Sequence, residues 1–541
     1  MDLELSDIST LLRKLNSVGV ALSVEKDHDR LLEIILIRAK EMARADGGTL
    51  YLRTEENTLR FEIVHTDSLG IHMGGKDGEP ISFYPVKLVK DDGEPNTHNV
   101  AACAVIKNET INIPDAYSNE EFDFAGTRNF DEKTGYRSQS FLTVPMTNHE
   151  NEIIGVLQLI NAKDVDTGEI RAFSKLDQQV VESLASQAAV TMTNRQLIDD
   201  QKKLFDSFIA LIASAIDEKS PYTAGHCRRV PVLTDMIAEA TCNISVGPHK
   251  DFNMTEADIY ELSVAGWLHD CGKITTPEAV VDKGTKLETI FDRIELIDTR
   301  FEVLKRDAEI AALKLKLETL GEKDLSAEEQ LNCKLKQLDD DRDFIRMCNV
   351  GGEAMADELQ QRVGNISRYQ WKNAHGEECD FLTEDEVYNL NIFRGTLTAE
   401  ERTIINNHMV ATIRMLESLP YPKHLLNVTE YAGGHHEKMD GTGYPKGLKR
   451  DQMSVQARMM GIADIFEALT AGDRPYKKAM PISQALTILG RMKLEDHVDP
   501  DLFDVFMWEK VYQKYADEFL DAEQYDDFDL NDIPGYVPPP G

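Results

Sequence analysis

Histidine and aspartate residues that could bind metal ions recur in the second half of this sequence, each within an apolar, helix-like segment. They occur singly and as adjacent pairs: His226, His269-Asp270, His408, His435-His436 and Asp464. Imidazole and carboxylate ligands together suit ions such as iron, manganese and zinc. In an adjacent His-Asp pair the carboxylate can bridge two ions while the imidazole binds one of them. A single residue of this kind is usually just a tolerated polar side chain, but five separate segments indicate a metal site.

The composition limits what such a site could serve. The chain has 541 residues and a formal charge of -36, which argues against a surface that binds polyanions. A small anionic substrate would need metal ions or a few local basic residues to neutralise it. The chain has no apolar run of about 20 residues, no signal-peptide pattern at its start and seven scattered cysteines without a disulfide spacing. We therefore expect a cytoplasmic protein of two to four domains.

The first part of the chain mixes helical and strand patterns. After an N-terminal segment (1–19), residues 20–171 contain a helical stretch at Leu31–Ala43 and alternating segments around 48–53 and 59–65. Two strand-like runs, Phe141–Pro145 and Ile153–Ile160, are separated by turn residues and predict a hairpin. This pattern is typical of an α+β sandwich, with helices flanking an antiparallel sheet.

A long connecting helix is predicted over 172–217, because neither Gly nor Pro interrupts its helical period. Val190, Leu197 and Leu204 recur at a spacing of seven, with Val180, Leu184 and Phe208 near the same stripe. A parallel dimeric coiled coil would bury this stripe, and packing on the helix's own domain is the alternative. We expect a homodimer.

The remainder is helical up to an acidic and Pro-rich surface tail at 516–541. One section, 289–393, is set apart by its heptads, which predict an antiparallel helical hairpin that turns near Leu320-Gly321-Glu322. The heptad positions are Ile290, Ile297, Leu304 and Ala311, then Ile294, Phe301, Ala308 and Leu315, then Leu331, Leu338 and Ile345.

The second half resembles the HD-GYP subgroup of the HD phosphohydrolases. The resemblance covers about 205–515 and rests on three motifs. These are His269-Asp270-Cys271-Gly272-Lys273, His435-His436-Glu437 followed by Asp440-Gly441 and Gly443-Tyr444-Pro445, and Arg474-Pro475-Tyr476-Lys477. It implies an all-α metal-dependent phosphohydrolase domain with two or three ions, iron or manganese, that hydrolyses a cyclic dinucleotide. Cyclic di-GMP is the expected substrate, and cyclic GMP-AMP is the alternative, because base choice depends on details of the pocket.

The resemblance also implies a role for each residue at the site. One ion would be held by His226, His269, Asp270 and Asp464. Asp270 would bridge to a second ion, held by His408, His435 and His436. Lys273 would contact the scissile phosphate, and the substrate side would be lined by Tyr444, Arg474 and Lys477. Two ions about 3.5–4 Å apart can activate a water and stabilise phosphoryl charge, while Lys273 adds a donor.

Two departures from the subgroup stand out. Glu467 occupies a position where many members have Asp. The segments that carry His269 and His408 are much further apart than usual, and the subgroup's intervening pattern is split between Lys283–Leu287 and Gly395–Thr398. The section 289–393 is therefore interpreted as an insertion of about 100 residues whose ends lie close together.

The first domain resembles a GAF domain. The resemblance rests on Asp131–Tyr136, Phe141–Pro145 and Gly155–Asn161, and leaves the GAF ligand open. Cys103 is interpreted as a buried structural thiol rather than a reactive one. The combined hypothesis is a GAF-regulated cyclic dinucleotide phosphodiesterase. The alternatives are an inactive HD-GYP protein that binds nucleotide or protein partners, and an HD phosphohydrolase that acts on another nucleotide.

Overall fold

The chain forms two compact units, and each is described here by itself. The computed structural model describes residues 5–25, 27–219, 225–318, 325–352, 354–472 and 479–540. Unit 1 spans Met1–Leu204 and unit 2 spans Phe205–Gly541. The predicted hairpin turn at Leu320-Gly321-Glu322 and the predicted substrate residues Arg474 and Lys477 lie outside the described residues. Within the described ranges, no helix combines the length and apolar character needed to cross a membrane.

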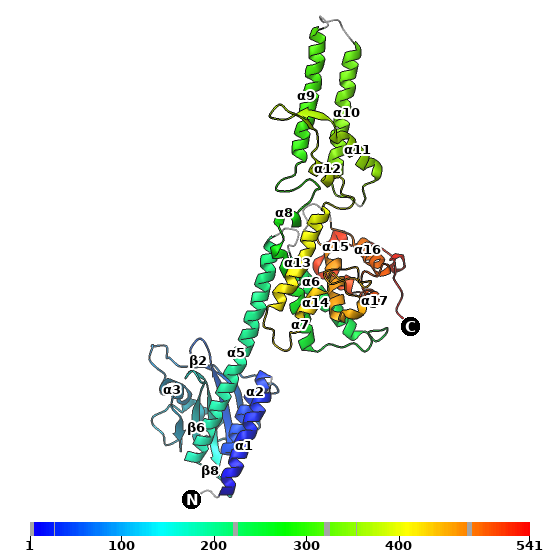
Figure 1. The fold of residues 1–541 in the computed structure, drawn as a ribbon. Coiled ribbons are helices and arrows are strands. Elements are labelled where there is room, and N and C mark those ends of the chain that lie inside the picture. The colour runs from blue at the N-terminus through cyan, green and yellow to red at the C-terminus, as the bar shows by residue number, and fades with distance from the viewer. Residues whose placement is uncertain are drawn as a thin grey trace. The chain divides into compact units, whose positions relative to one another are not determined.

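Unit 1 is an α+β domain built on one antiparallel sheet (Figure 1). Its helices are α1 (Leu5–Val24), α2 (His28–Ala43), α3 (Val100–Lys107), α4 (Ala125–Thr134) and the first part of α5 (Lys175–Lys219). Its strands are β1 (Ala45–Arg53), β2 (Thr58–Thr66), β3 (Ile71–Gly74), β4 (Val86–Lys87), β5 (Ile111–Ile113), β6 (Phe141–Thr147), β7 (Ile153–Lys163) and β8 (Ile170–Arg171). The α+β prediction for this domain is confirmed.

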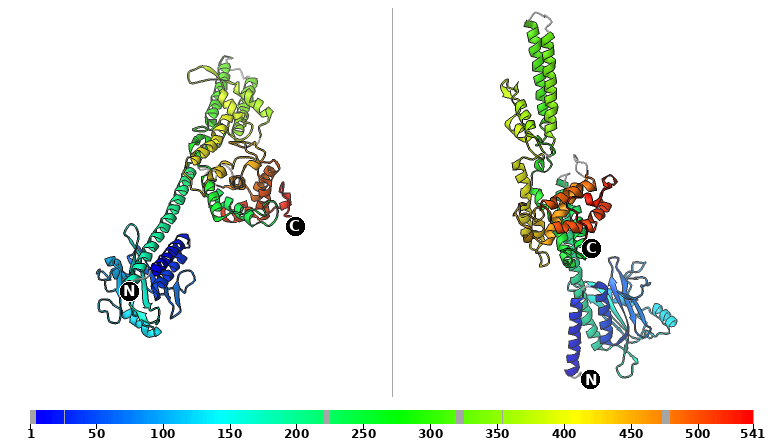
Figure 2. Two further views of the ribbon diagram at one scale, coloured as in Figure 1. Left: turned by 60° about the horizontal axis from the view of Figure 1, so that its bottom comes forward. Right: turned by 90° about the vertical axis from the view of Figure 1, so that its right-hand side faces the viewer.

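The sheet separates two apolar layers. Its strand order is β3-β2-β1-β7-β6-β5, with β4 paired to β2 and β8 to β7, and β6 and β7 form the hairpin that the sequence predicts. Helices α1, α2 and α5 pack on one face, and α3 packs on the other (Figure 2). Cys103 on α3 is fully buried in the second layer, and this burial raises the pKa of its thiol.

Helix α5 changes partners along its length. Near its start, Leu184, Ala185 and Ala188 are buried in the core of unit 1, so this part of the predicted stripe packs on its own domain. Near its end, Ile209 and Ile216 are buried in the core of unit 2. Between and beside these positions the apolar side chains of the heptad stripe face solvent. They are Leu197, Leu204, Phe208 and Leu211, each more than half exposed.

Unit 2 is almost entirely helical, as predicted. Its main helices are α6 (His226–Asn243), α7 (Glu256–Leu268), α13 (Ala399–Glu417), α14 (Val428–Gly433), α15 (Val455–Thr470), α16 (Ile482–Leu494), α17 (Pro500–Trp508) and α18 (Val511–Phe519). Shorter elements are α8 (Glu278–Val281) and the 3-10 turns η1 (Cys271–Thr275), η2 (Arg450–Gln452), η3 (Ala522–Gln524) and η4 (Leu530–Asp532). Helix α6 is central, because α7, α15, α17 and α18 all pack against it.

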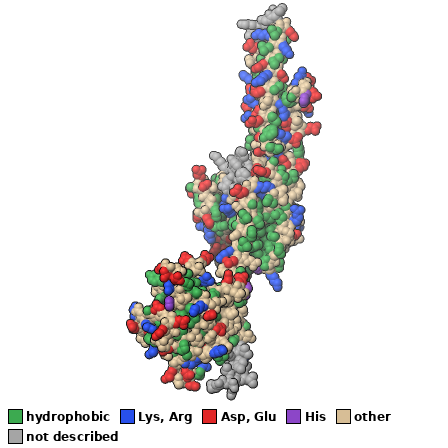
Figure 3. Space-filling view, turned by 90° about the vertical axis from the view of Figure 1, so that its left-hand side faces the viewer, with side chains coloured by type: hydrophobic (Ala, Val, Ile, Leu, Met, Phe, Trp, Pro, Cys, Tyr) green, Lys and Arg blue, Asp and Glu red, His purple; other side chains and the backbone are tan. Residues whose placement is uncertain are grey.

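The section 289–393 forms a lobe with a hydrophobic core of its own, and it is more than the predicted hairpin. Helices α9 (Ile294–Glu318) and α10 (Leu325–Asn349) are followed by α11 (Asp357–Ser367), a β-hairpin of β9 (Gln370–Lys372) and β10 (Glu378–Asp380), and α12 (Glu384–Leu390). Phe301, Ile345 and Phe381 lie in this core. Ile290, which the heptads placed on the helix, precedes α9 and is 95% exposed. Acidic and basic side chains alternate over the outer surface of the α9–α10 pair (Figure 3).

The two ends of this lobe meet at the surface of unit 2. The backbone of Lys283 accepts a hydrogen bond from Thr396 Oγ1 at 2.9 Å, and the Lys283 ammonium pairs with Glu401 at 2.7 Å. Lys286 is buried, and its ammonium donates to the carbonyl oxygens of Leu390 and Ile392. Side-chain contacts thus join the chain segment that enters the lobe to the segment that leaves it.

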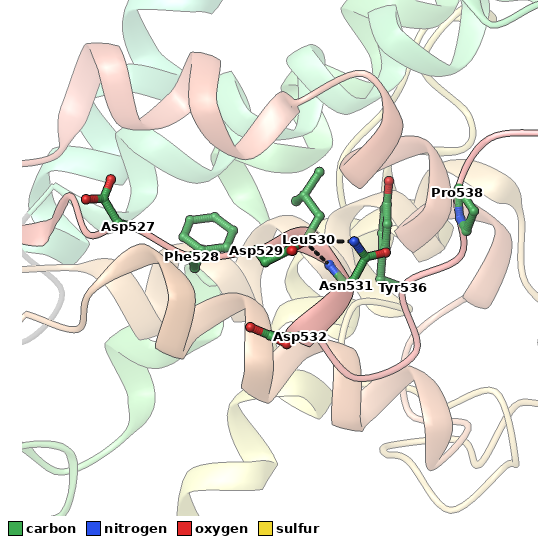
Figure 4. A pocket seen from close by; sticks show the side chains of 8 residues that line it. All are labelled: Asp527, Phe528, Asp529, Leu530, Asn531, Asp532, Tyr536 and Pro538. Atoms are coloured by element: carbon green, nitrogen blue, oxygen red, sulfur yellow. Dashed lines mark hydrogen bonds between the residues drawn. The ribbon is translucent and has the colours of Figure 1, made fainter.

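The C-terminal segment predicted as a surface tail, 516–541, is mostly exposed, and a few of its residues anchor it to unit 2. Ala516 and Ile533 are buried in the core of unit 2, and Trp508 Nε1 donates to the Val537 carbonyl at 2.6 Å. A few apolar residues within this acidic, Pro-rich stretch therefore suffice to anchor it. An open hollow of about 850 Å³ lies on this segment (Figure 4). Its lining residues are Asp527, Phe528, Asp529, Leu530, Asn531, Asp532, Tyr536 and Pro538.

Candidate metal centre

Helix ends in unit 2 bring the predicted metal ligands together. His226 is the first residue of α6, His269 and Asp270 directly follow α7, and His435 and His436 follow α14 after one residue, Gly434. His408 lies within α13 and Asp464 within α15. All are buried except His436, which is partly exposed. Three of these helices begin at side-chain caps, Thr255 for α7, Thr398 for α13 and Ser454 for α15, which fix where the ligands fall along the chain.

Four ligand atoms converge in the first group. His226 Nε2 lies 3.2 Å from Asp464 Oδ1 and 3.3 Å from Asp270 Oδ2. His269 Nε2 lies 3.3 Å from Asp270 Oδ2 and 3.8 Å from Asp464 Oδ1, and the two Nε2 atoms are 3.3 Å apart. Ligands about 2.0–2.2 Å from a shared ion lie about 3–3.5 Å from one another. The spacing of these four atoms therefore suits one bound ion.

A second group lies on the other oxygen of Asp270. Asp270 Oδ1 is 3.3 Å from His408 Nε2, and ligand atoms of His408, His435 and His436 lie within 4.8 Å of one another. Asp270 thus offers one carboxylate oxygen to each group. This is the geometry that a bridging carboxylate needs.

Backbone carbonyls fix the orientation of three imidazole rings. The Nδ1 atoms of His269, His408 and His435 lie 2.6, 2.6 and 2.7 Å from the carbonyl oxygens of the residues three positions earlier, Gly266, Ile405 and Ala432. With Nδ1–H donating to the backbone, each ring turns Nε2 toward the centre as a lone-pair acceptor. The tautomer that binds a metal is therefore set by the local helix geometry.

Three buried atoms of the centre lack partners. Among the described residues, Asp270 Oδ1, His408 Nε2 and His435 Nε2 are buried and make no hydrogen bond. Leaving a buried polar atom unsatisfied costs about 1–3 kcal/mol, and more for a charged group. Three such atoms directed at one region fit a centre that holds cations. The donor set therefore fits divalent transition-metal ions.

At four ligands the electrostatics favour the protonation state that metal binding needs. At His226, by contrast, burial would lower the pKa, but the surrounding carboxylates, Glu467 foremost, raise it well above its usual range. Burial lowers the pKa of His435 well below its usual range, and it lowers the pKa of His436 to about 4. Burial alone would raise the pKa of Asp270, but Lys273 and His269 hold that pKa well below the ordinary value. The pKa of Asp464 is held equally low, chiefly by His226, against the same burial effect. Neutral imidazoles and ionised carboxylates are the forms that bind metal.

Glu467 and Arg229 support His226, and the sequence analysis did not assign them this role. Fully buried Glu467 accepts from His226 Nδ1 through Oε2 and from Arg229 Nε through Oε1 at 2.7 Å. Burial would raise the pKa of Glu467, but His226 and Arg229 lower it to about 2. The available signal was spacing: Glu467 follows Asp464 by three positions and Arg229 follows His226 by three, so each shares a helix face with a ligand.

Gly272 sets the approach of η1 to α13. A Cβ at this position would lie 2.1 Å from the carbonyl oxygen of His408. The amide of Gly272 donates to Thr412 Oγ1 at 2.9 Å. Only glycine permits the backbone that follows Asp270 to lie this close to the helix that carries His408.

Two of the four predicted substrate residues lie near the metal centre, and the other two lie outside the described residues. Lys273 Nζ lies 2.5 Å from Asp270 Oδ2. The Tyr444 ring stacks on His436 with a centroid distance of 4.8 Å. Glu437 holds the loop that follows Tyr444, because its two carboxylate oxygens accept hydrogen bonds from the backbone amides of Lys446 and Leu448. Arg474 and Lys477 lie outside the described residues.

Comparison with known proteins gives the class of each unit. The GAF domain family model matches residues 27–192, and the HD domain family model matches residues 384–502. The chain therefore contains a GAF domain followed by an HD domain. The HD match includes His408, His435, His436 and Asp464, whereas His226, His269 and Asp270 precede it.

Relatives share parts of this chain. A 3′3′-cGAMP-specific phosphodiesterase of Vibrio cholerae is 26% identical over 304 residues, which is 56% of this chain and 39% of the relative. A cyclic di-GMP phosphodiesterase of Pseudomonas aeruginosa is 36% identical over 21% of this chain and 26% of its own length. A cyclic di-GMP phosphodiesterase of Thermotoga maritima is 33% identical over 23% and 34%. The chain thus spans 39% or less of these relatives.

Proposed function

We propose that this protein is a metal-dependent phosphodiesterase that hydrolyses a cyclic dinucleotide under the control of its GAF domain. The observation that carries the proposal is the convergence of two ligand groups on the two oxygens of Asp270, with buried ligand atoms that lack partners. The activities named for the relatives support the same reaction. Cyclic di-GMP is the proposed substrate, and 3′3′-cGAMP is the alternative.

The residues of the chain divide the work of this reaction. His226, His269 and Asp464 would hold one ion, His408, His435 and His436 a second, and Asp270 would join them. Two divalent ions would supply Lewis-acid stabilisation of the phosphate and lower the pKa of an attacking water. Carbonyl-fixed imidazoles keep the ligand atoms oriented, so little reorganisation accompanies the reaction.

Two described residues beside the metal ligands, Lys273 and Tyr444, are the proposed substrate contacts near the centre. The Lys273 ammonium, held at the shared carboxylate, is placed to donate to a phosphate oxygen. Tyr444 is placed to orient the dinucleotide, since its ring lies over His436 at the edge of the centre. Arg474 and Lys477 remain proposed substrate contacts on the strength of their motif alone.

The test is a substrate panel on reconstituted full-length protein. We expect at least two iron or manganese ions per chain by elemental analysis. We also expect hydrolysis of cyclic di-GMP or 3′3′-cGAMP, with products separated by chromatography to distinguish the linear dinucleotide from mononucleotides. At most one ion per chain would refute the two-ion centre. Full metal loading without hydrolysis of either compound would replace this proposal with an inactive nucleotide-binding protein.

The proposal includes a homodimer formed through α5. Leu197, Leu204 and Leu211 recur at a spacing of seven and are each more than half exposed, so an equivalent helix in a second copy matches them in register. Replacing Leu197 and Leu204 by Asp would place charges in that seam and weaken association. Light scattering at micromolar concentration measures this, and a strictly monomeric parent protein would refute the dimer.

We place the activity in the cytoplasm. All seven cysteines are free thiols, and four of them are buried. Free thiols are typical of a reducing compartment. Fractionation of cells that express the full-length protein would test this location.

A further inference from the structure

The last turn of α5 contacts two of the three backbone segments that carry the first group of metal ligands, namely the start of α6 and the turn that follows Asp270. Two residues in this turn make the contacts, Asp217 and Lys219, and together they are called the α5 clamp. Residues two positions apart on a helix point to opposite sides of it, so one turn can reach two separate segments.

Asp217 caps the helix that begins with His226. Its Oδ2 accepts from the amide of Gly225 at 3.0 Å, and its Oδ1 accepts from the amide of Cys227 at 3.4 Å. Gly225 occupies the cap position of α6 and has no side chain to satisfy these amides. A carboxylate is favourable at this end of a helix, where the unpaired amides carry partial positive charge. Asp217 thus performs the capping that α6 cannot supply itself.

Lys219 holds the turn that follows Asp270. Its ammonium donates to the carbonyl oxygens of Lys273, Ile274 and Thr276 at 3.1, 2.6 and 2.5 Å. These carbonyls lie at the C-terminal end of η1. A cation is favourable there, because the unpaired carbonyl oxygens carry partial negative charge. The same short element carries Lys273, whose own ammonium contacts Asp270.

We infer that Asp217 and Lys219 are positioning residues of the metal centre, through which the end of α5 sets the relative placement of His226 and Asp270. The inference deepens the proposed function and rests on it, because it names how that site is regulated. Helix α5 starts in the unit that contains the GAF domain and ends at the clamp. A displacement of the last turn of α5 would therefore move the start of α6 and the turn η1 directly, with no intervening element.

The test uses the full-length protein and four variants. Lys219→Met removes the ammonium but keeps a stem of similar length, and Asp217→Ala removes the cap. Lys219→Arg restores a cation that can donate to carbonyl oxygens. Glu218→Gln is the matched control, since Glu218 is the exposed residue between the two. Each protein is reconstituted with Mn²⁺, and metal content, the magnetic coupling between the two ions and steady-state kinetics are measured alongside thermal unfolding.

We expect Lys219→Met and Asp217→Ala to lower kcat by about 10- to 100-fold, as small misplacements of catalytic groups do, with KM changed by less than about 3-fold. The electron paramagnetic resonance signal of the coupled ions should also change. Lys219→Arg should recover most of kcat and the parent signal, and Glu218→Gln should match the parent. The inference is overturned if both clamp variants behave like Glu218→Gln, or if they lower the unfolding temperature without altering the coupled signal.

The metal signal separates failure of the inference from failure of the proposed function. If the parent protein binds two coupled ions but hydrolyses no cyclic dinucleotide, the proposed function fails. The clamp is still tested in that case by the signal alone. If the parent hydrolyses the substrate and the clamp variants leave both rate and signal unchanged, the proposed function stands and the clamp is refuted.

Discussion

Unit 2 contains two buried clusters in which histidines lie beside aspartates, and they differ in what surrounds the carboxylates. In the proposed metal centre, Asp270 Oδ1 makes no hydrogen bond and faces His408 Nε2 at 3.3 Å. In the second cluster, His249 lies near Asp499 and Asp501, again close enough to share an ion. There, however, Arg450 binds both carboxylates and Arg458 binds Asp499.

The difference shows that proximity of His and Asp does not by itself define a metal site. Two guanidinium groups neutralise the second cluster, and Asp499 also caps α17 through the amides of Asp501 and Leu502. An ion would have to displace these partners. Among the described residues, the lysine that contacts the carboxylates of the first cluster is Lys273, and its contact uses only one oxygen of Asp270. We therefore expect the first cluster to act in binding and the second in stability.

The largest expected effect is that of Asp270→Ala. This change removes the carboxylate shared by both ligand groups, so hydrolysis should fall below detection and bound metal should fall to one ion or none. The unfolding temperature of the metal-free protein should also fall, because the Lys273 ammonium loses the carboxylate that it pairs with. Elemental analysis, a hydrolysis assay and thermal unfolding measure the three quantities. Retention of two ions would contradict the bridging role.

Asp499→Ala should lower stability but leave the bound metal in place. It leaves Arg450 and Arg458 without their buried partner, which costs about 3–5 kcal/mol in the free energy of unfolding. Metal content per folded chain should match the parent protein. Chemical denaturation and elemental analysis distinguish the outcomes. Loss of metal without loss of stability would mean that the two clusters have been assigned the wrong way round.

Lys273→Ala should separate binding of ions from turnover. The ammonium contacts Asp270 but is not a ligand, so both ions should remain. By analogy with the loss of one oxyanion donor, we expect the barrier to rise by about 2–4 kcal/mol, seen mainly in kcat. Steady-state kinetics on metal-loaded protein test this. A variant as fast as the parent would show that the assigned phosphate contact is wrong.

Tyr444→Ala should have a smaller effect, on substrate binding. The ring stacks on His436 at the edge of the centre, and stacking of a base on an aromatic side chain contributes about 1–3 kcal/mol. We expect KM to rise more than kcat falls, and Tyr444→Phe to behave like the parent, because the stacking surface is kept. An equal loss in both variants would instead point to a role for the hydroxyl group.

The smallest effect on either cluster is expected from removing residues 289–393. The lobe has its own core around Phe301 and Phe381, and its ends meet at Lys283 and Thr396. Replacing the lobe by a short Gly/Ser linker should leave the metal content unchanged, and the stability that Asp499 contributes should also be unchanged. We expect the replacement to alter regulation or substrate access instead. Elemental analysis of the shortened protein tests this. Complete loss of metal would show that the lobe belongs to the metal-binding core.

Sequence alone predicted the parts of the protein that local patterns encode. The α+β fold of the first domain and the helical second unit followed from periodicity, and the ligand types followed from motifs. Spacing places Glu467 on the same helix face as Asp464, but its pairing with His226 was not predicted, because that contact joins α6 to α15 across the core. The strands around Trp371 and Cys379 are too short for a periodic signal. The ligand assignments themselves stay predictions until metal is measured.

The packed C-terminal segment also bears on the order in which the protein folds during synthesis. Ile533 joins the same core as Ile209 and Val230, which come from the start of unit 2. That core stays incomplete until the ribosome has released the segment around Ile533, whereas the sheet and covering helices of unit 1 emerge earlier and can fold first. Contacts between residues so distant in sequence form slowly. Stalled or prematurely terminated chains would thus present a folded unit 1 attached to an incompletely folded unit 2 with exposed apolar residues, a form that chaperones and proteases should recognise.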